Sequence, residues 1–439
     1  MSHPRFLEGE VRIIGHRWSP RVHELKAFLS RSRVAYRWLD VERDREALEA
    51  VGTAAPGTQR FPIVIFPDGT VLVEPDVRAV AEKLGLDTHP DSRTYDLIIV
   101  GAGPAGLTAA INAGSEGLRT VVAEQEVPGG QASYSASIEN YPGFPEGLSG
   151  SDLARRTLQQ AERFGVEIIV TRRATGLRTD EGRHLVSLDD GSELVADTVL
   201  LAIGVSFRWL DAPGCPALVG AGIYYGAATA EAAACAGQDI HVLGGGNSAG
   251  QAALLLARYA RHVTILTLED SLEETMSAYL VERIRRTENI SVLTGHTVVA
   301  AGGEGHLEWI EIQNVATRET VVVPADGLFV FIGATPRTDW LPPSVVRDAQ
   351  GFILAGIDLC RDGTLHAAWP LSREPYELET TTPGVFVAGD VRSGSVKRIA
   401  SAVGEGAMAV HLIHRYRGRA RNGAGRPAAN RQEQPLPRR

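Results

Sequence analysis

The sequence predicts an α/β protein in which two strand–turn–helix units follow a smaller mixed α/β domain. The apolar run YDLIIV at 95–100 leads directly into GAGPAG and an apolar helix, and such unbroken runs are typical of buried parallel strands. A second unit of this kind begins at residue 240, where IHVL precedes GGGNSAG. Residues 12–86 instead show a compact β-α-β pattern, followed by a hairpin and a closing helix.

Composition limits the class of protein. The chain has 439 residues, of which 44% are apolar and 22% are charged, which is ordinary for a soluble protein of two or three domains. A net charge of −9 argues against nucleic acid as a partner. No stretch approaches the roughly 20 apolar residues that cross a membrane, and the N-terminus lacks a signal-peptide core. We therefore expect a cytoplasmic protein without a membrane partner.

The small domain is predicted at residues 1–88, with a polar linker at 89–94. VRIIGH and VAYRWLDV are expected strands, and FPIVIFPDGTVLVEP is an expected hairpin with Asp68-Gly69 as its turn. Helical spacing predicts a helix over 20–31, and a second helix is expected over 77–84. The apolar face of the first helix should consist of Val22, Leu25, Phe28 and Leu29.

GAGPAG matches the pattern G-x-G-x-x-G and has the context of a dinucleotide-binding turn. Gly101 permits the tight turn, Gly103 lets the backbone approach a pyrophosphate, and Gly106 lets the helix pack on the strand. The helix N-terminus then faces the phosphates. Glu124 ends the next strand, where a carboxylate can bind ribose hydroxyls.

GGGNSAG repeats this pattern with Ala249 in the third glycine position. Two such units, one inserted in the other, suggest a flavin and a nicotinamide nucleotide as cofactors. We predict that 95–211 and 327–417 form the FAD-binding domain and that 212–326 form the NAD(P)-binding domain. A final helix is expected over about 402–414, and the basic tail 418–439 is expected to be disordered.

Residues 95–417 resemble the bacterial thioredoxin reductase family of flavoproteins. The matching motifs are GAGPAG, PGGQ (128–131), ENYPG (139–143), LLAIG (200–204), GGGNSAG, VFIGATPRTDWL (330–341) and GVFVAGDV (384–391). The resemblance implies two Rossmann-like domains that bind FAD and NAD(P)H, and a homodimer. The implied cofactor-binding residues are Gly101, Gly103, Pro104, Ala105, Gly106, Glu124, Gln125, Gly130, Gln131, Asn140, Ala202, Gly204, Gly389, Asp390, Lys397, Arg398 and Ile399, with Gly244, Gly246, Asn247, Ser248 and Ala249 in the second turn.

The N-terminal domain resembles a glutaredoxin, or a thioredoxin-fold relative of it. Where such domains carry Cys-Pro-x-Cys, this chain has Ser19-Pro20-Arg21-Val22. The resemblance also implies a cis peptide bond before Pro62.

The redox cysteine pair of the reductase family is absent as well. Its two positions fall on Gly226 and Thr229, and neither residue can perform thiol–disulfide exchange. Cys215, Cys235 and Cys360 form no CxxC pair and are too few for a disulfide framework or a metal site. We interpret Cys235 as a buried structural residue. The catalytic residues are unknown, and Tyr225 and Thr229 are candidates to line the flavin.

The residues that follow HVTIL bear on the choice of nucleotide. NADP-dependent members of the family carry an arginine pair there, whereas this chain has Leu268 and Glu269. A carboxylate repels a 2′-phosphate and can accept hydrogen bonds from ribose hydroxyls. The sequence therefore favours NADH over NADPH.

These observations predict an FAD-dependent NAD(P)H oxidoreductase that passes electrons from flavin directly to an acceptor other than thioredoxin. The acceptor could be a quinone, oxygen, a small molecule or an electron carrier. Three alternatives stay open. An external thiol could replace the lost cysteines, the flavin could oxidise a small metabolite, or the protein could be a non-catalytic flavin-binding redox sensor.

Overall fold

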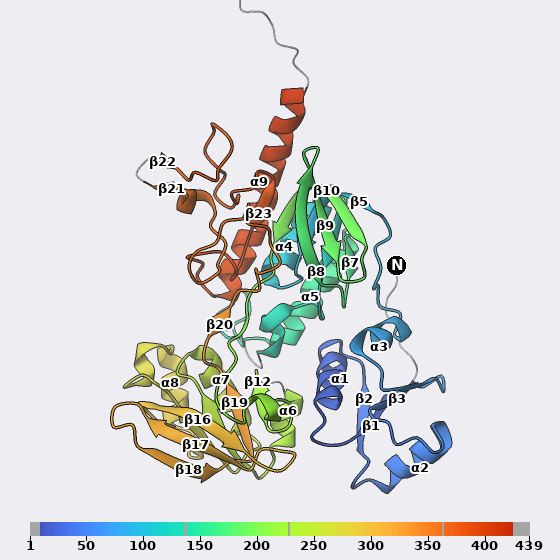
Figure 1. Cartoon of the computed structure of the whole chain (residues 1–439), viewed down its shortest axis with the longest axis vertical. Helices are drawn as coiled ribbons and strands as arrows, with labels where there is room; N and C mark the ends of the chain where they lie inside the picture. The colour runs from blue at the N-terminus through green and yellow to red at the C-terminus, as the bar shows by residue number, and fades with distance from the viewer. Residues whose placement is uncertain (1–8, 136–137, 227–228, 362–363, 425–439) are drawn as a thin grey trace, which may run out of the picture.

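The structure is a computed structural model that describes residues 9–135, 138–226, 229–361 and 364–424, which form three units (Figure 1). The N-terminal unit has a four-stranded sheet of order β2-β1-β3-β4, in which β1 is parallel to β2 and antiparallel to β3. The peptide bond before Pro62 is cis, as predicted. The elements are β1 (Val11–Gly15), α1 (Pro20–Arg31), β2 (Tyr36–Asp40), α2 (Arg45–Ala54), β3 (Ile63–Ile65), β4 (Val71–Val73) and α3 (Val77–Lys83).

Helix α1 forms where the sequence predicts it. The hydroxyl of Ser19 caps the helix by accepting from the backbone N–H of Val22, and Pro20 occupies the first turn. The predicted apolar residues form the buried face. Helix α2 was not predicted, because only Ala47 and Val51 are buried on it and its helical period is therefore weak.

The second unit, here called the GAGPAG unit, is built on a seven-stranded sheet. The order is β7-β6-β5-β10-β9-β8, and β23 pairs with β10 in parallel. Alternate residues of β5 enter two separate cores: Leu97 and Ile99 face the side of α4 and α9, and Ile98 and Val100 face the other side. The elements are β5 (Thr94–Val100), α4 (Pro104–Ser115), β6 (Thr120–Ala123), η1 (Gly130–Tyr134), α5 (Gly150–Arg163), β7 (Glu167–Ile169), β8 (Ala174–Asp180), β9 (Arg183–Leu188), β10 (Glu193–Leu201), η4 (Gly356–Leu359), β21 (Cys360–Arg361), β22 (Thr364–Leu365), β23 (Val385–Val387) and α9 (Ile399–Ala424).

The third unit, here called the GGGNSAG unit, has a five-stranded parallel sheet of order β12-β19-β13-β14-β15 and a separate three-stranded antiparallel sheet, β16-β17-β18. Two short strands, β11 (Ser206–Phe207) and β20 (Ala334–Thr335), pair where the chain crosses between the two units. The remaining elements are η2 (Pro216–Leu218), β12 (Ile223–Tyr225), α6 (Thr229–Ala234), β13 (Asp239–Leu243), α7 (Asn247–Leu256), β14 (His262–Leu266), η3 (Leu272–Glu274), α8 (Ala278–Arg285), β15 (Ile290–Leu293), β16 (His296–Gly302), β17 (Trp309–Asn314), β18 (Thr320–Pro324) and β19 (Gly327–Val330).

Two predicted boundaries need correction. Strand β19 pairs with β12 and β13, so residues 327–330 belong to the GGGNSAG unit and not to the second segment of the GAGPAG unit. Helix α9 continues to Ala424, so residues 418–424 are helical where a disordered tail was expected. Arg417 binds Asp96 and Asp197, which anchors the helix seven residues before its end, and residues 425–439 lie outside the described chain.

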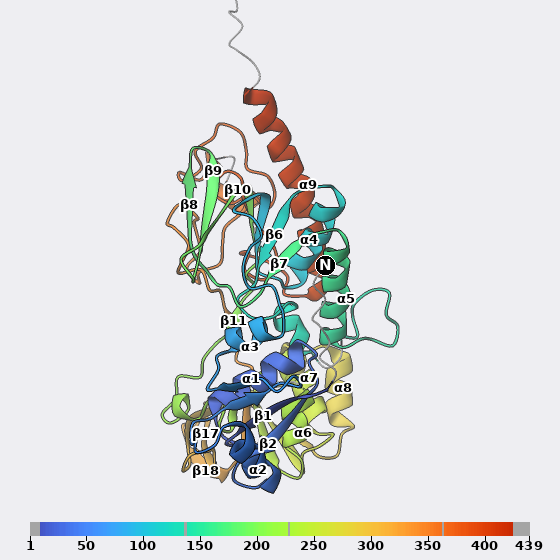
Figure 2. The same cartoon turned by 90° about the vertical axis from the view of Figure 1, so that its right-hand side faces the viewer.

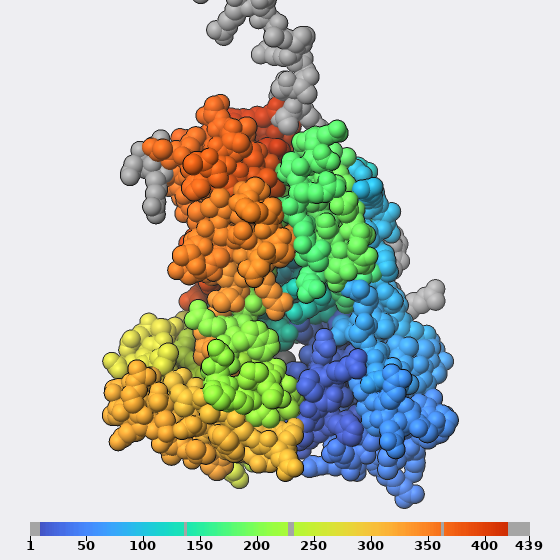
Figure 3. Space-filling model, in the orientation of Figure 1, coloured from blue at the N-terminus to red at the C-terminus, as the bar shows by residue number. Residues whose placement is uncertain are grey.

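The N-terminal unit lies beside the GGGNSAG unit and below the GAGPAG unit (Figures 1, 2 and 3). The predicted linker is part of this packing. Arg172, a residue 2% exposed, donates to the carbonyl of Thr88 and lies 2.7 Å from His89 Nε2 through Nη2. The N-terminal unit is therefore attached through residues that the GAGPAG unit holds in place.

No helix within the described residues is both long enough and apolar enough to cross a membrane.

Candidate functional site

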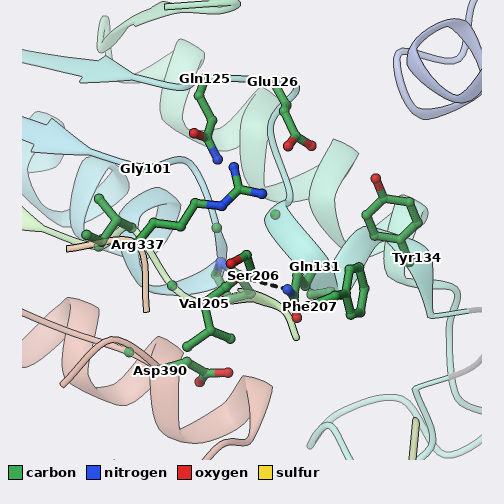
Figure 4. Close-up of a pocket in the computed structure, with 18 of the residues that line it drawn as sticks. Gly101, Gln125, Glu126, Gln131, Tyr134, Val205, Ser206, Phe207, Arg337 and Asp390 are labelled. Carbon is green, nitrogen blue, oxygen red and sulfur yellow. Dashed lines mark hydrogen bonds between the residues drawn. The ribbon is translucent and has the colours of Figure 1, made fainter. Parts of the chain in front are cut away.

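A cavity of about 770 Å³ lies where the GAGPAG unit meets the GGGNSAG unit. Its lining comes from the GAGPAG turn, the end of β6, helix η1, the segment 202–207 and residues 388–402. Helix α7 of the other unit contributes Ser248, Gln251, Ala252 and Leu255. Figure 4 shows that Gln131, Arg337 and Asp390 approach this space from different elements. The cavity has the size of a cofactor or substrate site.

The GAGPAG turn has the backbone form that a bound pyrophosphate requires. Gly101 has φ +102°, and a Cβ there would overlap the carbonyl of Ala202. A Cβ on Gly106 would overlap the carbonyl of Gly101, whereas a Cβ on Gly103 would meet no atom within 4 Å. The turn is therefore tight at Gly101 and Gly106 and open at Gly103, which fits a dinucleotide phosphate at the N-terminus of α4.

Glu124 lies against the second residue of this turn. Its carboxylate accepts hydrogen bonds from the N–H of Ala102 at 2.7 Å and of Glu126 at 2.8 Å. Burial raises the pKa of Glu124, and these backbone donors act in the opposite direction. The carboxylate lines the cavity, where it could accept from a ribose hydroxyl; that contact stays a prediction.

Gln131 and Asp390 also line the cavity. Gln131 donates to the carbonyl of Val205 at 2.7 Å, the dashed bond in Figure 4. Burial raises the pKa of Asp390, while the charge of Lys397 lowers it, and Lys397 Nζ donates to the Asp390 carbonyl at 3.1 Å. These side chains can hold the ribityl and ring portions of a flavin.

The structure brings most of the predicted FAD residues together at this cavity. The predicted residues that line it are Gly101, Gly103, Pro104, Ala105, Glu124, Gln125, Gly130, Gln131, Ala202, Gly204, Tyr225, Ser248, Gly389, Asp390, Lys397, Arg398 and Ile399. Gly106 packs inside the turn. Asn140 is exposed and does not line the cavity, since its segment turns back between the bridged residues Ile138 and Leu148. Thr229 begins α6, and its side chain lies outside the described part of the chain.

Sequence reasoning missed an aromatic wall. The cavity is also lined by Tyr134, Phe207 and Trp209, next to the predicted Tyr225. Trp209 packs on Tyr225 with ring centres 4.5 Å apart, and Tyr134 meets Phe207 edge-on at 6.2 Å. Trp209 is nevertheless 61% exposed. No motif marks these residues, because the wall forms only when β11 and η1 come together in space.

Gly226 occupies the first position of the missing cysteine pair. It has φ +95°, and a Cβ there would lie 3.3 Å from the ring of Phe207. Cys215 and Cys235 are buried elsewhere, and burial raises the pKa of the Cys215 thiol to about 11. Cys235 belongs to the core of the GGGNSAG unit, as predicted. Among the described residues, no cysteine lines the cavity.

The GGGNSAG turn repeats the first turn in detail. Gly244 has φ +142°, and a Cβ there would overlap the carbonyl of Phe331. Glu269 lies against Gly245, since a Cβ on this glycine would come 2.5 Å from Glu269 Oε2. Asn247 accepts from the N–H of Ser277 at 2.7 Å. Of the predicted residues of this turn, only Ser248 reaches the shared cavity, whereas Gly244, Gly246, Asn247 and Ala249 do not line it.

Comparison with known proteins places this site in a family. Residues 95–406 match the family model described as pyridine nucleotide-disulphide oxidoreductase. The chain belongs to this family. It is an enzyme of the thioredoxin reductase type with a further N-terminal unit of about 90 residues outside the match.

Three relatives show the extent of the similarity. A 34.2 kDa protein in a rubredoxin operon of Clostridium pasteurianum is 32% identical over 75% of this chain and 99% of its own length. Thioredoxin reductase of Treponema pallidum is 33% identical over 73% of this chain and 97% of its own. The crystal structure of thioredoxin reductase from Lactococcus lactis (FR conformation) superposes with a TM-score of 0.66 and 29% identity, and covers 73% and 98% of the two chains.

FAD and NAD(P)H are the cofactors typical of this family. The open backbone at Gly103, the buried carboxylate of Glu124 and the amide of Gln131 fit FAD in the shared cavity. The intact GGGNSAG turn fits a nicotinamide nucleotide on the adjoining unit.

Proposed function

We propose that the protein is an NADH-dependent flavin oxidoreductase that passes electrons directly to a small acceptor. One observation carries the proposal. Helix α7, which begins at the nucleotide turn, lines the same cavity as the GAGPAG turn, and the former cysteine position in that cavity is Gly226. The nucleotide-binding unit and the GAGPAG unit therefore border one cavity, and no cysteine among the described residues lines it.

Bound FAD would supply the two-electron redox chemistry between a nicotinamide and an acceptor. The chain supplies orientation and electrostatics. Glu124 and Gly103 would hold the dinucleotide, and the hydrogen bond from Gln131 to the carbonyl of Val205 would fix the cavity wall beside the flavin ring. We favour a planar conjugated acceptor such as a quinone, because Trp209 is exposed at this cavity and rests on Tyr225.

The preference for NADH is supported by Glu269. Its carboxylate accepts from the hydroxyl of Thr267 and lies against Gly245. This is the counterpart of Glu124 and Ala102 in the first turn, where the carboxylate faces a ribose site. A negative charge in this place repels the 2′-phosphate of NADPH.

We further propose that the N-terminal unit is a thioredoxin-fold domain that has lost redox function. The sheet order β2-β1-β3-β4 and the cis bond before Pro62 support the fold. Ser19 and Val22, in place of its two cysteines, support the loss of function. The homodimer stays a prediction.

The test is anaerobic reduction of the purified yellow protein, monitored by the absorbance of oxidised flavin. We expect rapid bleaching by NADH, slower bleaching by NADPH, and reoxidation by a benzoquinone but not by a disulfide such as 5,5′-dithiobis(2-nitrobenzoate). Bound flavin that neither nucleotide bleaches would contradict the proposal. Turnover with the disulfide but not with quinones would instead favour a reductase that uses an external thiol.

A further inference from the structure

Arg31, at the end of α1 in the N-terminal unit, reaches the cavity of the reductase units. It lies outside the matched residues 95–406, yet it is one of the residues that line the cavity. Its side chain is only 9% exposed. A buried arginine that crosses from one unit to another must be well paired to offset its desolvation.

Each guanidinium nitrogen of Arg31 donates to the GAGPAG unit. Nη1 donates to Glu126 Oε2 at 2.7 Å and to the hydroxyl of Tyr134 at 2.8 Å. Nε donates to Ser133 Oγ at 3.3 Å, and Nη2 donates to the carbonyl of Val127 at 3.4 Å. The guanidinium carbon also lies 4.5 Å from the centre of the Tyr134 ring. The guanidinium therefore contacts both the hydroxyl group and the ring face of Tyr134.

Tyr134 leads from Arg31 to the former disulfide site. Its ring meets Phe207 edge-on, and a Cβ on Gly226 would lie 3.7 Å from Tyr134 Cδ1. A row of neighbouring residues thus runs from Arg31 through Tyr134 and Phe207 to Gly226.

Other residues of the N-terminal unit contact both the GAGPAG unit and the GGGNSAG unit. Arg33 pairs with Asp152 at 2.6 Å on the GAGPAG unit. On the GGGNSAG unit, Trp18 stacks on His306 with ring centres 5.1 Å apart and planes 10° apart. A Cβ on Gly220 would lie 3.1 Å from Pro20 Cα. The Ser19-Pro20 turn that carries cysteines in redox-active relatives is here a packing surface.

We propose that Arg31 is a positioning residue of the flavin cavity, which holds Tyr134 and Phe207 in place on the acceptor side. The N-terminal unit is then a permanent wall of the site and not an electron carrier. This inference rests on the proposed function insofar as flavin occupies the cavity, but it does not depend on which acceptor is used.

The experiment compares Arg31→Ala with Arg33→Ala in the full-length yellow protein. Both variants remove an arginine from the same docking surface, but Arg33 does not line the cavity. For Arg31→Ala we expect a shifted visible flavin spectrum, altered flavin fluorescence and a KM for benzoquinone raised by about tenfold, with kcat nearly unchanged, since a charge-assisted pair is lost. Arg33→Ala should match the parent protein in every readout.

Two further variants keep the test decisive if Arg31→Ala does not fold. Tyr134→Phe leaves the docking surface in place and removes one hydrogen bond, so it should shift the flavin spectrum in the same direction by a smaller amount. Arg31→Lys keeps the charge without the planar fork and should restore KM only in part. Spectra of Arg31→Ala and Tyr134→Phe identical to those of Arg33→Ala would overturn the inference. A parent protein without flavin would instead overturn the proposed function.

Discussion

The two glycine turns of the molecule have the same backbone motif, but they differ in the burial and hydrogen bonding of the carboxylate beside them. In each turn, a carboxylate that follows the next strand lies against the second residue of the turn: Glu124 against Ala102, and Glu269 against Gly245. Glu124 is 6% exposed and accepts from two backbone N–H groups. Glu269 is only partly buried and accepts from a side-chain hydroxyl.

On the proposed function, the difference would separate a resident FAD from an exchanging nicotinamide nucleotide. The first turn is enclosed by segments from residues 202–207 and 388–402, whereas most of the second turn lies outside the shared cavity. The third turn positions differ as well, because Gly106 has no room for a Cβ while Ala249 already carries one. The same backbone motif can therefore retain FAD in one unit and release a nicotinamide nucleotide from the other.

The largest expected effect comes from Gly106→Ala. The new methyl group would overlap the Gly101 carbonyl, and such overpacking costs about 1–3 kcal/mol or more in a rigid turn. We expect protein that purifies with little flavin, measured as the ratio of absorbance at 450 nm to that at 280 nm. Retention of flavin at the parent ratio would show that the first turn is no tighter than the second.

The next largest effect tests the carboxylate of the second turn. Glu269→Gln removes a charged acceptor, worth about 1.5–3 kcal/mol when it binds a ribose hydroxyl, so the KM for NADH should rise by about tenfold or more. NADPH should be affected much less. Glu273→Gln is the matched control, because Glu273 pairs with Arg285 on the protein surface. Equal effects of the two substitutions would contradict the role of Glu269.

Each reductase unit also buries one histidine, and this makes its stability depend on pH. Burial lowers the pKa of His184 and of His241 to about 4. In the unfolded chain, each binds a proton below its ordinary pKa of about 6.5, so folding stability decreases as the pH falls from about 6.5 to 4. The loss per histidine is on the order of 2 kcal/mol at pH 5.

Replacement of either histidine should therefore reduce acid sensitivity. His184→Leu and His241→Leu should each narrow the difference in Tm between pH 7.5 and pH 5, measured by circular dichroism. His411→Leu, at an exposed position, provides the control and should leave the difference unchanged. If the His184 and His241 variants show the same difference in Tm between the two pH values as the parent protein, these histidines are not the source of the acid sensitivity.

The smallest effect is expected for Ala249→Gly, the reverse of the first substitution. Glycine within a helix costs about 0.5–1 kcal/mol relative to alanine, and the second turn has no need of the freed space. Tm should fall by a few degrees, and the KM for NADH should stay within about twofold, since no ligand contact is lost. A large loss of NADH binding would show that the methyl group of Ala249 supports the nucleotide site.

Local pattern predicted most elements, but not the boundaries that depend on partners in space. GAGPAG and GGGNSAG identified both turns, because strand, glycines and helix lie within one short segment. Strand β19 was given to the wrong unit, since a buried apolar run carries no mark of the sheet it joins. The predicted end of helix α9 is too early, because Arg417 pairs with Asp96, which lies 321 residues earlier in the chain. A local sequence pattern does not contain this contact.

The candidate site divides in the same way. The glycines of the two turns and the carboxylate of Glu124 can be predicted from their spacing along the chain. Arg31, Tyr134, Phe207 and Trp209 meet only because three units come together, and no sequence interval connects them. Asn140, chosen by resemblance alone, lies outside the cavity.

The linker held by Arg172 has a consequence for how the N-terminal unit stays in place. Exposed ion pairs such as Arg33–Asp152 contribute about 1 kcal/mol or less each, so this docking surface need not support a stable complex between separate chains. A short tether, pinned at Thr88 and His89, raises the effective concentration of the unit at its docking surface to the millimolar range or above. Covalent continuity thus acts together with the buried contacts of Arg31 and keeps the N-terminal unit seated at its docking surface.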